Sequence, residues 1–462
     1  MKIFNTLTRS KDELVPITPG EVKIYACGPT VYNYIHIGNA RPLCVFDVLR
    51  RYLEWRGYKV NFVQNFTDID DKLIKKANEE GITVPEVAER FIKEFWVDAK
   101  GLNVREATTH PRATENIDEI RRIISELVEK GYAYTAGGDV YFRSKKFDEY
   151  GKLSHQPLED LEAGARIATD DIKEDPMDFC LWKGAKPGEP YWESPWGQGR
   201  PGWHIECSAM NKTAFGEQID LHGGGRDLIF PHHENEIAQT EALTGKQFVK
   251  YWVHNGLIKV NGQKMSKSLG NSLLMSDLLK KFPNEAIKFA LLQTNYRNDI
   301  NITDDLFPEA EKHLYEFYKV FTLATDKAIK IEGDYPEIDQ KFDEALSDDF
   351  NTALALSELY AYFKRIKSLI AEGNPEAGQM LSQIKKTYSL LGIFTKNPKE
   401  FVTAYEKTHK EDVPEEILAL ANQMQSARLE KNYALADSLR AQILEKGYAV
   451  MISKEGVSVK KA

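Results

Sequence analysis

The chain has 462 residues, of which 42% are hydrophobic and 28% are charged, a composition that is typical of soluble globular proteins and excludes disordered or collagen-like chains. At roughly 150 residues per domain this length predicts about three domains and excludes a lone binding module. The 61 lysine and arginine residues against 70 aspartate and glutamate residues give a formal net charge of −9. This balance argues against general affinity for nucleic acid, so any RNA contact must come from a local patch.

The cysteines are too few and too scattered for a disulfide scaffold. They are Cys27, Cys44, Cys180 and Cys207. Such usage indicates a reducing compartment, where cysteines bind metal, react or pack. No apolar run approaches the ~18 residues of a membrane helix, and charges follow closely on the first residues. We therefore expect an unprocessed cytoplasmic protein that does not bind membranes.

Residues 1–95 alternate between strand and helix patterns. A strand is predicted at 22–26 and a helix from Arg41 to Trp55. A second strand at 58–66 leads into helical segments at 72–80 and 85–95. This order predicts an α/β fold with a doubly wound parallel sheet of the Rossmann type, in which ligands bind beyond the carboxyl ends of the strands.

The next 200 residues or so read as an insertion followed by the rest of the sheet. Residues 114–130 predict a helix, a hairpin follows that turns at Gly137-Gly138, and residues 187–203 predict a long ordered loop. Strands at 219–221 and 251–260, with helices at 204–215 and 232–243, return to the α/β pattern. We therefore expect a catalytic domain at 1–303, with an insertion at about 100–200.

The remaining third of the chain has a helical texture. Residues 304–394 predict a helical bundle, 395–414 a polar break, and 415–446 a helical segment before a short, weakly basic tail. We expect a bundle domain at 304–394 and a small C-terminal domain at 395–462.

A glycine pattern at residues 197–202 matches the dinucleotide fingerprint without its context. Gly197, Gly199 and Gly202 follow Ser-Pro-Trp instead of a strand, and Pro201 would remove a donor from the phosphate-binding turn. NAD binding is therefore not expected. A P-loop motif is absent from the sequence as well.

Two other short motifs can hold phosphates. HIGN, residues 36–39, opens the first long helix, where the dipole and free N–H groups favour an anion and where His36 and Asn39 add donors. KMSKS, from Lys264 to Ser268, places two ammonium groups in a loop between glycines. Taken alone, HIGN also fits a packing glycine beside a surface histidine, and KMSKS also fits a solvated basic turn. Together they form the two-part signature of class I aminoacyl-tRNA synthetases.

A third constellation is suited to a metal. Cys27 ends the first strand, Cys207 lies in a helical segment, and His232 and Glu236 are four residues apart on one helix face. Two thiolates, an imidazole and a carboxylate suit Zn²⁺.

Alternatives to this metal set remain open from the residues alone. His233 could replace its neighbour as the ligand, and His204 could pair with the cysteine three residues later. Cys44 and Cys180 are interpreted as packing residues, the commoner role of a lone cysteine.

Long stretches of the chain resemble the cysteinyl-tRNA synthetase family. Across residues 2–305 they are KIFNTLTR, YACGPTVYNYIHIGNARP, NFTDIDDKLIKKA, PMDFCLWK, PGWHIECSAMN, DLHGGGRDLIFPHHENEIAQ and KMSKSLGN. Residues 340–394 resemble the helical anticodon-region domain of the family more loosely, and ARLEKNYALADSLRAQI resembles its C-terminal helix pattern. The resemblance implies activation of L-cysteine with ATP and Mg²⁺, transfer to tRNA(Cys), one Zn²⁺ per chain and a monomeric enzyme.

The same resemblance implies roles for individual residues. It places Zn²⁺ on Cys27, Cys207, His232 and Glu236, and so selects His232 over His233. It implies an amino-acid pocket at Thr67, Trp203 and Asp227, and ATP contacts at His36, Gly38, Asn39, His222, Gly223, Gly224, Gly225 and Lys267. Catalysis falls to His36, Lys264 and Lys267. The usual family motif ends in histidine where this chain has Asn39, whose amide can still donate, so we expect a modest effect.

The expected chemistry needs positioning and charge stabilisation, with no protein nucleophile. Zinc would select cysteine over serine by binding the thiolate, because an apolar pocket separates such near-isosteres by only about 10². Three rival interpretations are a tRNA-independent cysteine ligase with the same adenylation core, a non-catalytic zinc and RNA-binding scaffold, and a zinc hydrolase. The hydrolase lacks its H-E-x-x-H helix, because PHHENE offers H-x-x-x-E.

Overall fold

The computed structural model describes residues 1–156, 172–264, 272–409, 414–453 and 456–461. They form two compact units, Met1–Lys396 and Asn397–Ala462, which are treated separately below. Among the helices in these ranges, none combines the length and the apolarity needed to cross a membrane.

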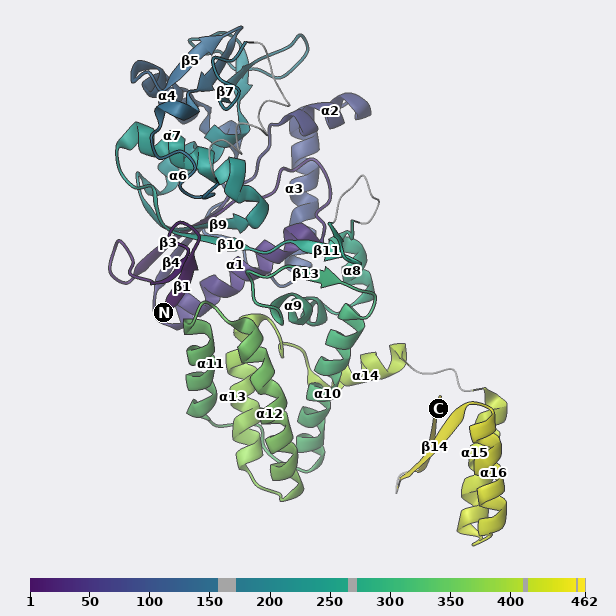
Figure 1. Ribbon diagram of the computed structural model, residues 1–462. Helices are drawn as coiled ribbons and strands as arrows, with labels where there is room; N and C mark the ends of the chain where they lie inside the picture. The colour runs from purple at the N-terminus through teal and green to yellow at the C-terminus, as the bar shows by residue number, and fades with distance from the viewer. Residues whose placement is uncertain (157–171, 265–271, 410–413, 454–455, 462) are drawn as a thin grey trace. The chain divides into compact units, whose positions relative to one another are not determined.

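A parallel sheet with strand order β10-β9-β3-β4 lies at the centre of the larger unit (Figure 1). Its strands are β3 (Glu21–Ala26), β4 (Lys59–Gln64), β9 (Ile219–Gly225) and β10 (Val249–Asn255). In the middle of the sheet Ile24 pairs with Phe62 on one side and with Leu221 on the other. These apolar strands are covered on both faces, as a parallel sheet requires. The predicted doubly wound sheet is confirmed.

Helices cover the two faces of this sheet. α1 (Ile37–Trp55) lies beneath it in Figure 1, and α6 (Trp203–Phe215) and α7 (Glu234–Thr244) lie above it. The approach of α1 is close: a Cβ on Gly223 would lie 2.1 Å from Cζ of Phe46. α2 (Asp71–Glu80) and α3 (Val84–Gly101) follow β4.

The predicted insertion is a small α/β layer at the top of Figure 1. α4 (Ile117–Glu129) packs its isoleucine face on an antiparallel sheet of order β5-β6-β7-β8. The strands are β5 (Ala133–Ala136), β6 (Asp139–Phe142), β7 (Phe179–Gly184) and β8 (Gly199–Pro201). The expected hairpin is confirmed as β5-β6. The expected loop at 187–203 contains β8. In the glycine pattern that resembled a dinucleotide fingerprint, Gly199 begins β8 and Gly202 is the N-cap of α6.

The chain segment expected as one strand at 251–260 is two strands in different sheets. It divides into β10 and β11 (Ile258–Val260), and β11 pairs with β12 (Gln263–Lys264) and β13 (Ile300–Ile302). Gly256 separates the two strands, and a Cβ there would lie 2.3 Å from the carbonyl oxygen of Asn298. The prediction of a continuous strand was therefore wrong, because the pattern did not show how closely these backbones approach.

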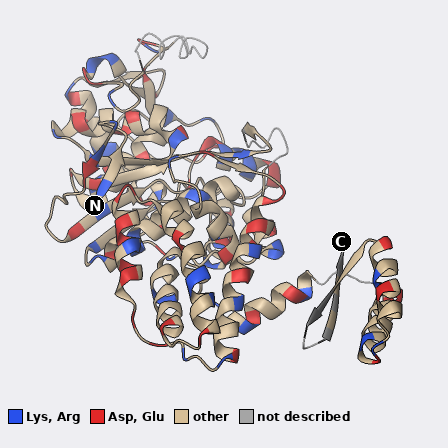
Figure 2. Ribbon diagram, turned by 60° about the horizontal axis from the view of Figure 1, so that its bottom comes forward, with Lys and Arg blue, Asp and Glu red and all other residues tan. Residues whose placement is uncertain are grey.

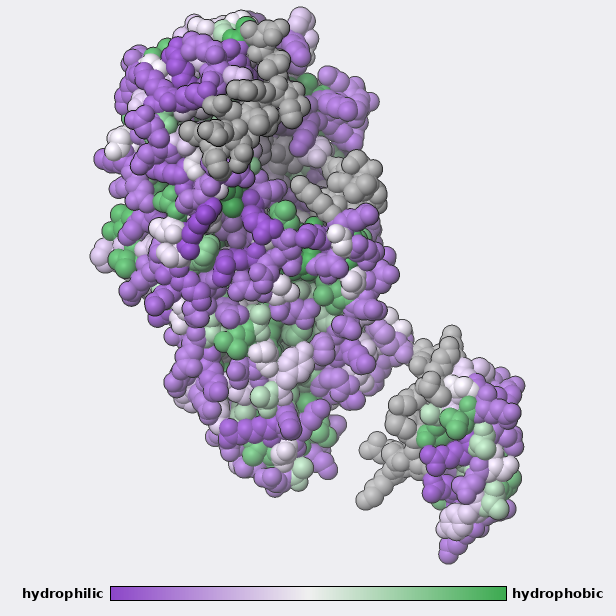
Figure 3. Space-filling model, viewed as in Figure 1, coloured by the Kyte–Doolittle hydropathy of each residue, from purple (hydrophilic) through white to green (hydrophobic). Residues whose placement is uncertain are grey.

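The helical region packs directly on the sheet domain. Its helices are α8 (Met275–Lys281), α9 (Asn284–Leu292), α10 (Leu306–Asp326), α11 (Pro336–Ser347), α12 (Thr352–Ala371) and α13 (Glu376–Tyr388). Asp349, before α12, accepts hydrogen bonds from the Tyr296 hydroxyl and from Nε of Arg297, each at 2.8 Å. These contacts explain why 1–303 and 304–394 lie within one compact unit. Lys and Arg alternate with Asp and Glu over the exposed faces (Figure 2), and apolar patches on the face in Figure 3 are small.

The smaller unit contains more regular structure than the sequence predicted. Its elements are α14 (Pro398–Thr408), α15 (Glu415–Leu429), α16 (Tyr433–Glu445), β14 (Tyr448–Ser453) and β15 (Gly456–Lys461). The expected polar break contains α14, which Asn397 caps through backbone N–H groups two and three residues on. The expected single helix at 415–446 is divided near Asn432, which caps α16. The expected tail forms a hairpin whose Val457 and Val459 pack on the helices.

Candidate active site

A cavity of about 390 Å³ opens at the carboxyl end of the parallel sheet. Residues that follow β3, β9 and β10 line it, together with the start of α1. They include Cys27 to Thr30, Gly225, Asp227, and Asn255 to Ile258. This is the position at which ligands bind in doubly wound sheets. The cavity thus lies beyond the carboxyl ends of the strands, where the sequence predicts a ligand site.

The HIGN segment lies in the wall of this cavity. His36 is the N-cap of α1, and His36, Gly38 and Asn39 all line the space. Oδ1 of Asn39 accepts a hydrogen bond of 3.1 Å from the backbone N–H of His36. Asn39 thus also stabilises the helix start, which is a structural role for the residue where the family more often has histidine. The backbone N–H groups of Ile37 and Asn39 already donate to Leu273 and His36, so the feature that favours an anion here is the positive end of the helix dipole.

Arg41 lies outside the recognised motifs and connects α1 by hydrogen bonds to the backbone on the other side of the cavity. Its side chain is fully buried, and its guanidinium donates to backbone carbonyl oxygens of Leu257, Asn295, Tyr296 and Asn298. Leu257 itself lines the cavity. The sequence signal was an arginine inside an otherwise apolar helix face, where a charged residue has to find buried acceptors.

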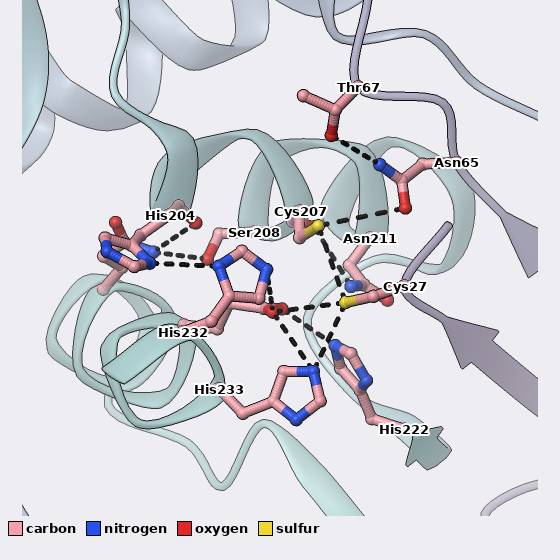
Figure 4. A network of polar contacts seen from close by, with 12 residues as sticks. Cys27, Asn65, Thr67, His204, Cys207, Ser208, Asn211, His222, His232 and His233 are labelled. Carbon is pink, nitrogen blue, oxygen red and sulfur yellow. Dashed lines mark hydrogen bonds and ion pairs between the residues drawn. The ribbon is translucent and has the colours of Figure 1, made fainter. Parts of the chain in front are cut away.

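Cys27, which lines the cavity, belongs to a dense cluster of thiol, imidazole and carboxylate groups (Figure 4). The other members are buried behind it. The Sγ atoms of Cys27 and Cys207 are 3.8 Å apart, and Oε1 of Glu236 is 3.8 Å from Sγ of Cys27. Nε2 of His232 is 3.1 Å from the same carboxylate oxygen. One ligand atom from each of these residues lies within 4.8 Å of all the others. The structure therefore brings the four predicted zinc ligands together.

A second set of four shares two members with the first. It combines Cys27 and Glu236 with His222 and His233. Nε2 of His233 is 3.3 Å from Sγ of Cys27, and Nε2 of His222 is 2.8 Å from Oε2 of Glu236. The alternative ligand His233 thus remains geometrically possible. The first set is chemically better for Zn²⁺, because it uses both thiols and leaves His222 to support the carboxylate.

The environment of the cluster is that of a cation site. Burial raises the pKa of the Cys27 thiol well above its ordinary value, and the neighbouring Cys207 adds to this shift. Burial also raises the pKa of Glu236 and lowers that of His232. A divalent cation would reverse the cost of ionising the thiols and the carboxylate, and a neutral imidazole is already the ligand form. The residues therefore fit Zn²⁺.

Further histidines fix the orientation of the cluster side chains, a role that the sequence did not indicate. Nδ1 of His204 is 3.0 Å from Nδ1 of His232, and Nδ1 of His233 is 2.8 Å from Nε2 of His254. His254 in turn contacts the Thr6 hydroxyl at 2.7 Å. Such partners fix ring orientation at metal sites. The available signal was the position of His254 at the end of a buried strand.

The predicted amino-acid pocket lies between the cluster and the cavity. The Trp203 ring stacks on His232 with centroids 4.2 Å apart and remains 41% exposed. Trp203 and Asp227 line the cavity. Thr67 is buried and accepts a hydrogen bond from the amide of Asn65, whose Oδ1 accepts another from the backbone of Gly28 at 2.9 Å. The structure thus brings Trp203 and Asp227 to the space, with Thr67 just behind its wall.

The other predicted ATP contacts differ in position. Of the glycine run Gly225 lines the space, whereas His222, Gly223 and Gly224 are buried behind the cavity wall, and their contact with ATP stays a prediction. His222 instead stacks on Trp252 with centroids 4.6 Å apart. Lys264 ends β12. Lys267 lies outside the described residues.

Comparisons with known proteins agree with this architecture. The family model for the class I (C) tRNA synthetase catalytic domain matches residues 13–312, and the DALR domain model matches residues 341–395. The cysteine–tRNA ligase of Caldicellulosiruptor saccharolyticus is 48% identical over 100% of both chains. That of Clostridioides difficile is 52% identical over 86% of this chain and 88% of its own length.

Solved structures show the same fold at low identity. Mycobacterium tuberculosis methionyl-tRNA synthetase in complex with methionyl-adenylate has a TM-score of 0.60 at 14% identity, covering 83% of this chain and 96% of its own. A leucyl enzyme from Agrobacterium radiobacter, solved as a ternary complex of LeuRS with tRNA and LeuAMS, has a TM-score of 0.60 at 12% identity, covering 85% and 86%. With a catalytic-domain match over more than half its length and relatives of 48% and 52% identity, the chain belongs to the cysteine–tRNA ligase family of class I aminoacyl-tRNA synthetases.

Proposed function

We propose that this chain activates L-cysteine with ATP and transfers the cysteinyl group to tRNA(Cys). One observation carries the proposal: a single cavity is lined both by the start of the HIGN helix and by Cys27, behind which Cys207, His232 and Glu236 complete the cluster. The first feature suits a triphosphate and the second suits a thiol. Adenylation is assigned to residues 1–303, and contact with tRNA to the bundle at 304–394 and the small domain at 395–462.

The first step forms cysteinyl-adenylate. A carboxylate oxygen of cysteine attacks the α-phosphorus of Mg²⁺-ATP, and the bond to pyrophosphate breaks with its electron pair leaving on pyrophosphate. His36 and the positive end of the α1 dipole hold the phosphates. Lys264 and Lys267 supply positive charge to the departing pyrophosphate. No protein nucleophile is needed, so the rate depends on positioning and charge.

The cluster is assigned to the selection of cysteine. Cys27, Cys207, His232 and Glu236 would hold the zinc ion, one per chain, and when bound it supplies selective affinity for a thiolate over a hydroxyl. Trp203 covers this end of the cavity, and Asp227 offers a carboxylate to the cysteine ammonium group. Thr67 supports the wall between them.

The rival functions fit the structure less well. A tRNA-independent cysteine ligase needs only the adenylation core, whereas residues 341–395 here match a DALR domain and pack on that core through Asp349. A non-catalytic scaffold gives no reason for a cavity between the HIGN helix and the cluster.

Cysteine-dependent ATP–pyrophosphate exchange, with and without tRNA(Cys), tests the proposal. We expect exchange without tRNA and acylation of the terminal ribose when tRNA(Cys) is added. Exchange with normal rates but no acylation would indicate the ligase instead, and absence of exchange would indicate the scaffold.

A further inference from the structure

We propose that the wall formed by Tyr32, Tyr34 and Lys72 receives the single-stranded 3′ end of the tRNA. The inference rests on the proposed function, because it assumes that an aminoacyl group leaves the cavity on a ribose. It adds a binding platform for the third substrate. This platform is defined as the side chains of these three residues.

Elimination within the cavity points to this wall. The thiol cluster and Trp203 occupy the end suited to cysteine, and the HIGN segment with Gly225 and Asn255 to Ile258 surrounds the part suited to ATP. Tyr32, Asn33, Tyr34, Lys72 and Phe95 also line the same space, and the proposed function assigns none of them to cysteine or ATP. The terminal ribose has to reach the adenylate carboxyl group, so its nucleotide must enter this cavity beside the cysteinyl-adenylate.

The side chains of the platform have the chemistry that binds single-stranded nucleic acid. Tyr34 is 40% exposed although its ring is large and partly apolar. It meets Phe91 edge to face, with centroids 5.3 Å apart and planes at 86°, so the contact fixes the ring and leaves a face available. Bases stack on such exposed rings without regard to sequence.

Lys72 supplies the cation for this platform. It lies in the first turn of α2, with Nζ 5.4 Å from the centroid of the Tyr32 ring. The backbone N–H of Lys72 donates to the Asp70 carboxylate at 2.7 Å, which fixes the helix start. An ammonium group beside exposed aromatic rings can meet a backbone phosphate while a base stacks next to it. Among the residues that line the cavity, Lys72 is the cation that this wall offers to a phosphate.

The platform binds and does not enter the chemistry. In the transfer step a ribose hydroxyl oxygen attacks the carboxyl carbon of cysteinyl-adenylate and a new ester C–O bond forms. The bond between that carbon and the AMP phosphate oxygen breaks, AMP leaves with the electron pair, and the hydroxyl proton passes to a phosphate oxygen of the departing AMP. The role of the platform is to hold the nucleotide where this attack can occur.

Two substitutions in the full-length, zinc-loaded protein test the proposal. Tyr34→Ala should lower kcat/KM for tRNA(Cys) about 5- to 100-fold, the range that base–aromatic stacking gives, and Tyr34→Phe should restore most of it. Lys72→Met should also reduce the slope of log kcat/KM against log salt by about 0.7, as expected for one lost phosphate contact on a single strand. Lys75→Met, on the solvent face of the same helix, is the matched control and should leave both quantities unchanged.

Binding of intact tRNA(Cys) and of tRNA lacking its 3′-terminal nucleotides locates the contact. The proposal predicts that Tyr34→Ala weakens the complex with intact tRNA and leaves the complex with shortened tRNA unchanged. The fold loss in the rate of transfer should be at least five times the fold loss in the rate of pyrophosphate exchange. Equal weakening of both complexes, or a rise in KM for ATP that matches the loss in transfer, would overturn it. Absence of cysteine-dependent exchange in the wild-type protein would overturn the proposed function, whatever the variants do.

Discussion

Replacing Arg41 by methionine tests whether the buried guanidinium holds the two walls of the cavity together. Of the carbonyl oxygens that it contacts, those of Leu257 and Tyr296 keep other donors, the N–H groups of Ile300 at 2.9 Å and Gly256 at 2.8 Å. The carbonyl of Asn295 keeps the N–H of Asn298 as a donor at 3.0 Å. Within the described part of the chain only Arg41 donates to the carbonyl of Asn298, which is itself an exposed residue. The substitution therefore removes the charge-assisted hydrogen bonds and leaves that one carbonyl without a protein donor.

The expected cost follows from the loss of these bonds. Hydrogen bonds to a charged group contribute about 1.5–3 kcal/mol. Burial lowers the pKa of Arg41 to about 10, opposed by the nearby Asp299, so the side chain stays charged at neutral pH and its removal also relieves a desolvation cost. We expect the free energy of unfolding to fall by about 2 kcal/mol. Because Leu257 lines the cavity, KM for ATP should rise roughly 10-fold, since small displacements of positioning groups are costly.

Urea denaturation and pyrophosphate exchange measure the two effects separately. Arg51→Met is the control, because Arg51 lies on the same helix and bonds Asp47 at 2.9 Å and the carbonyl of Asn103 at 2.8 Å, away from the cavity. It should lose stability and keep its KM for ATP. If Arg41→Met keeps the wild-type KM for ATP while losing stability, Arg41 supports the fold alone and the reasoning is refuted.

Four further predictions concern the metal, pH, the KMSKS loop and the smaller unit. Cys207→Ser should lower the zinc content below about one per chain and should also raise KM for cysteine. Elemental analysis measures the first effect and pyrophosphate exchange the second. Normal zinc content with weak cysteine binding would contradict the ligand assignment. Burial lowers the pKa of His110 to about 4, and its Nε2 accepts from the N–H of Ala107. This group therefore stabilises the fold above pH 6.5, and its contribution of up to about 3 kcal/mol is lost as pH falls from 6.5 towards 4; His110→Gln should flatten urea-derived stability over that window. Lys267→Ala should slow single-turnover activation by roughly 10² to 10³ with little change in KM for cysteine, and a wild-type rate would make the loop a solvated basic turn. A chain ending at Lys396, the limit of the larger compact unit, should keep pyrophosphate exchange and lose most tRNA acylation, whereas equal losses in both assays would contradict the division of labour.

The parallel sheet and the position of the site could be predicted from the sequence because both depend on local signals. Short apolar runs followed by helical spacing identify βαβ units, and the strand ends then give the place of the ligand cavity. Cys27 and the pair His232 and Glu236 were recognisable because ligand chemistry and helix spacing coincide. That the Cys207 thiol lies beside Cys27 could not be predicted from spacing, because the two residues are 180 positions apart and only the packing of α6 near the end of β3 brings them together.

Features that depend on contacts distant in sequence could not be predicted in the same way. The strand at 251–260 divides because Gly256 packs against the backbone near Asn298, and no periodicity reports that contact. Gly223 looked like a nucleotide contact but is required by the close approach of Phe46. The position of Arg41 in an apolar helix face indicates that it needs buried acceptors, but only the structure shows that these are four carbonyl groups distant in sequence.

The central claim is that zinc at the Cys27–Cys207–His232–Glu236 cluster selects cysteine for activation. Its most direct test is the ratio of kcat/KM for cysteine and for serine in pyrophosphate exchange, measured on zinc-loaded protein and again after zinc removal. We predict a ratio above about 10⁴ with zinc, because recognition through a specific ligand atom exceeds the ~10² of an apolar pocket, and loss of cysteine activation without it. A ratio near 10² in the loaded protein, or full cysteine activation by zinc-free protein, would contradict the account.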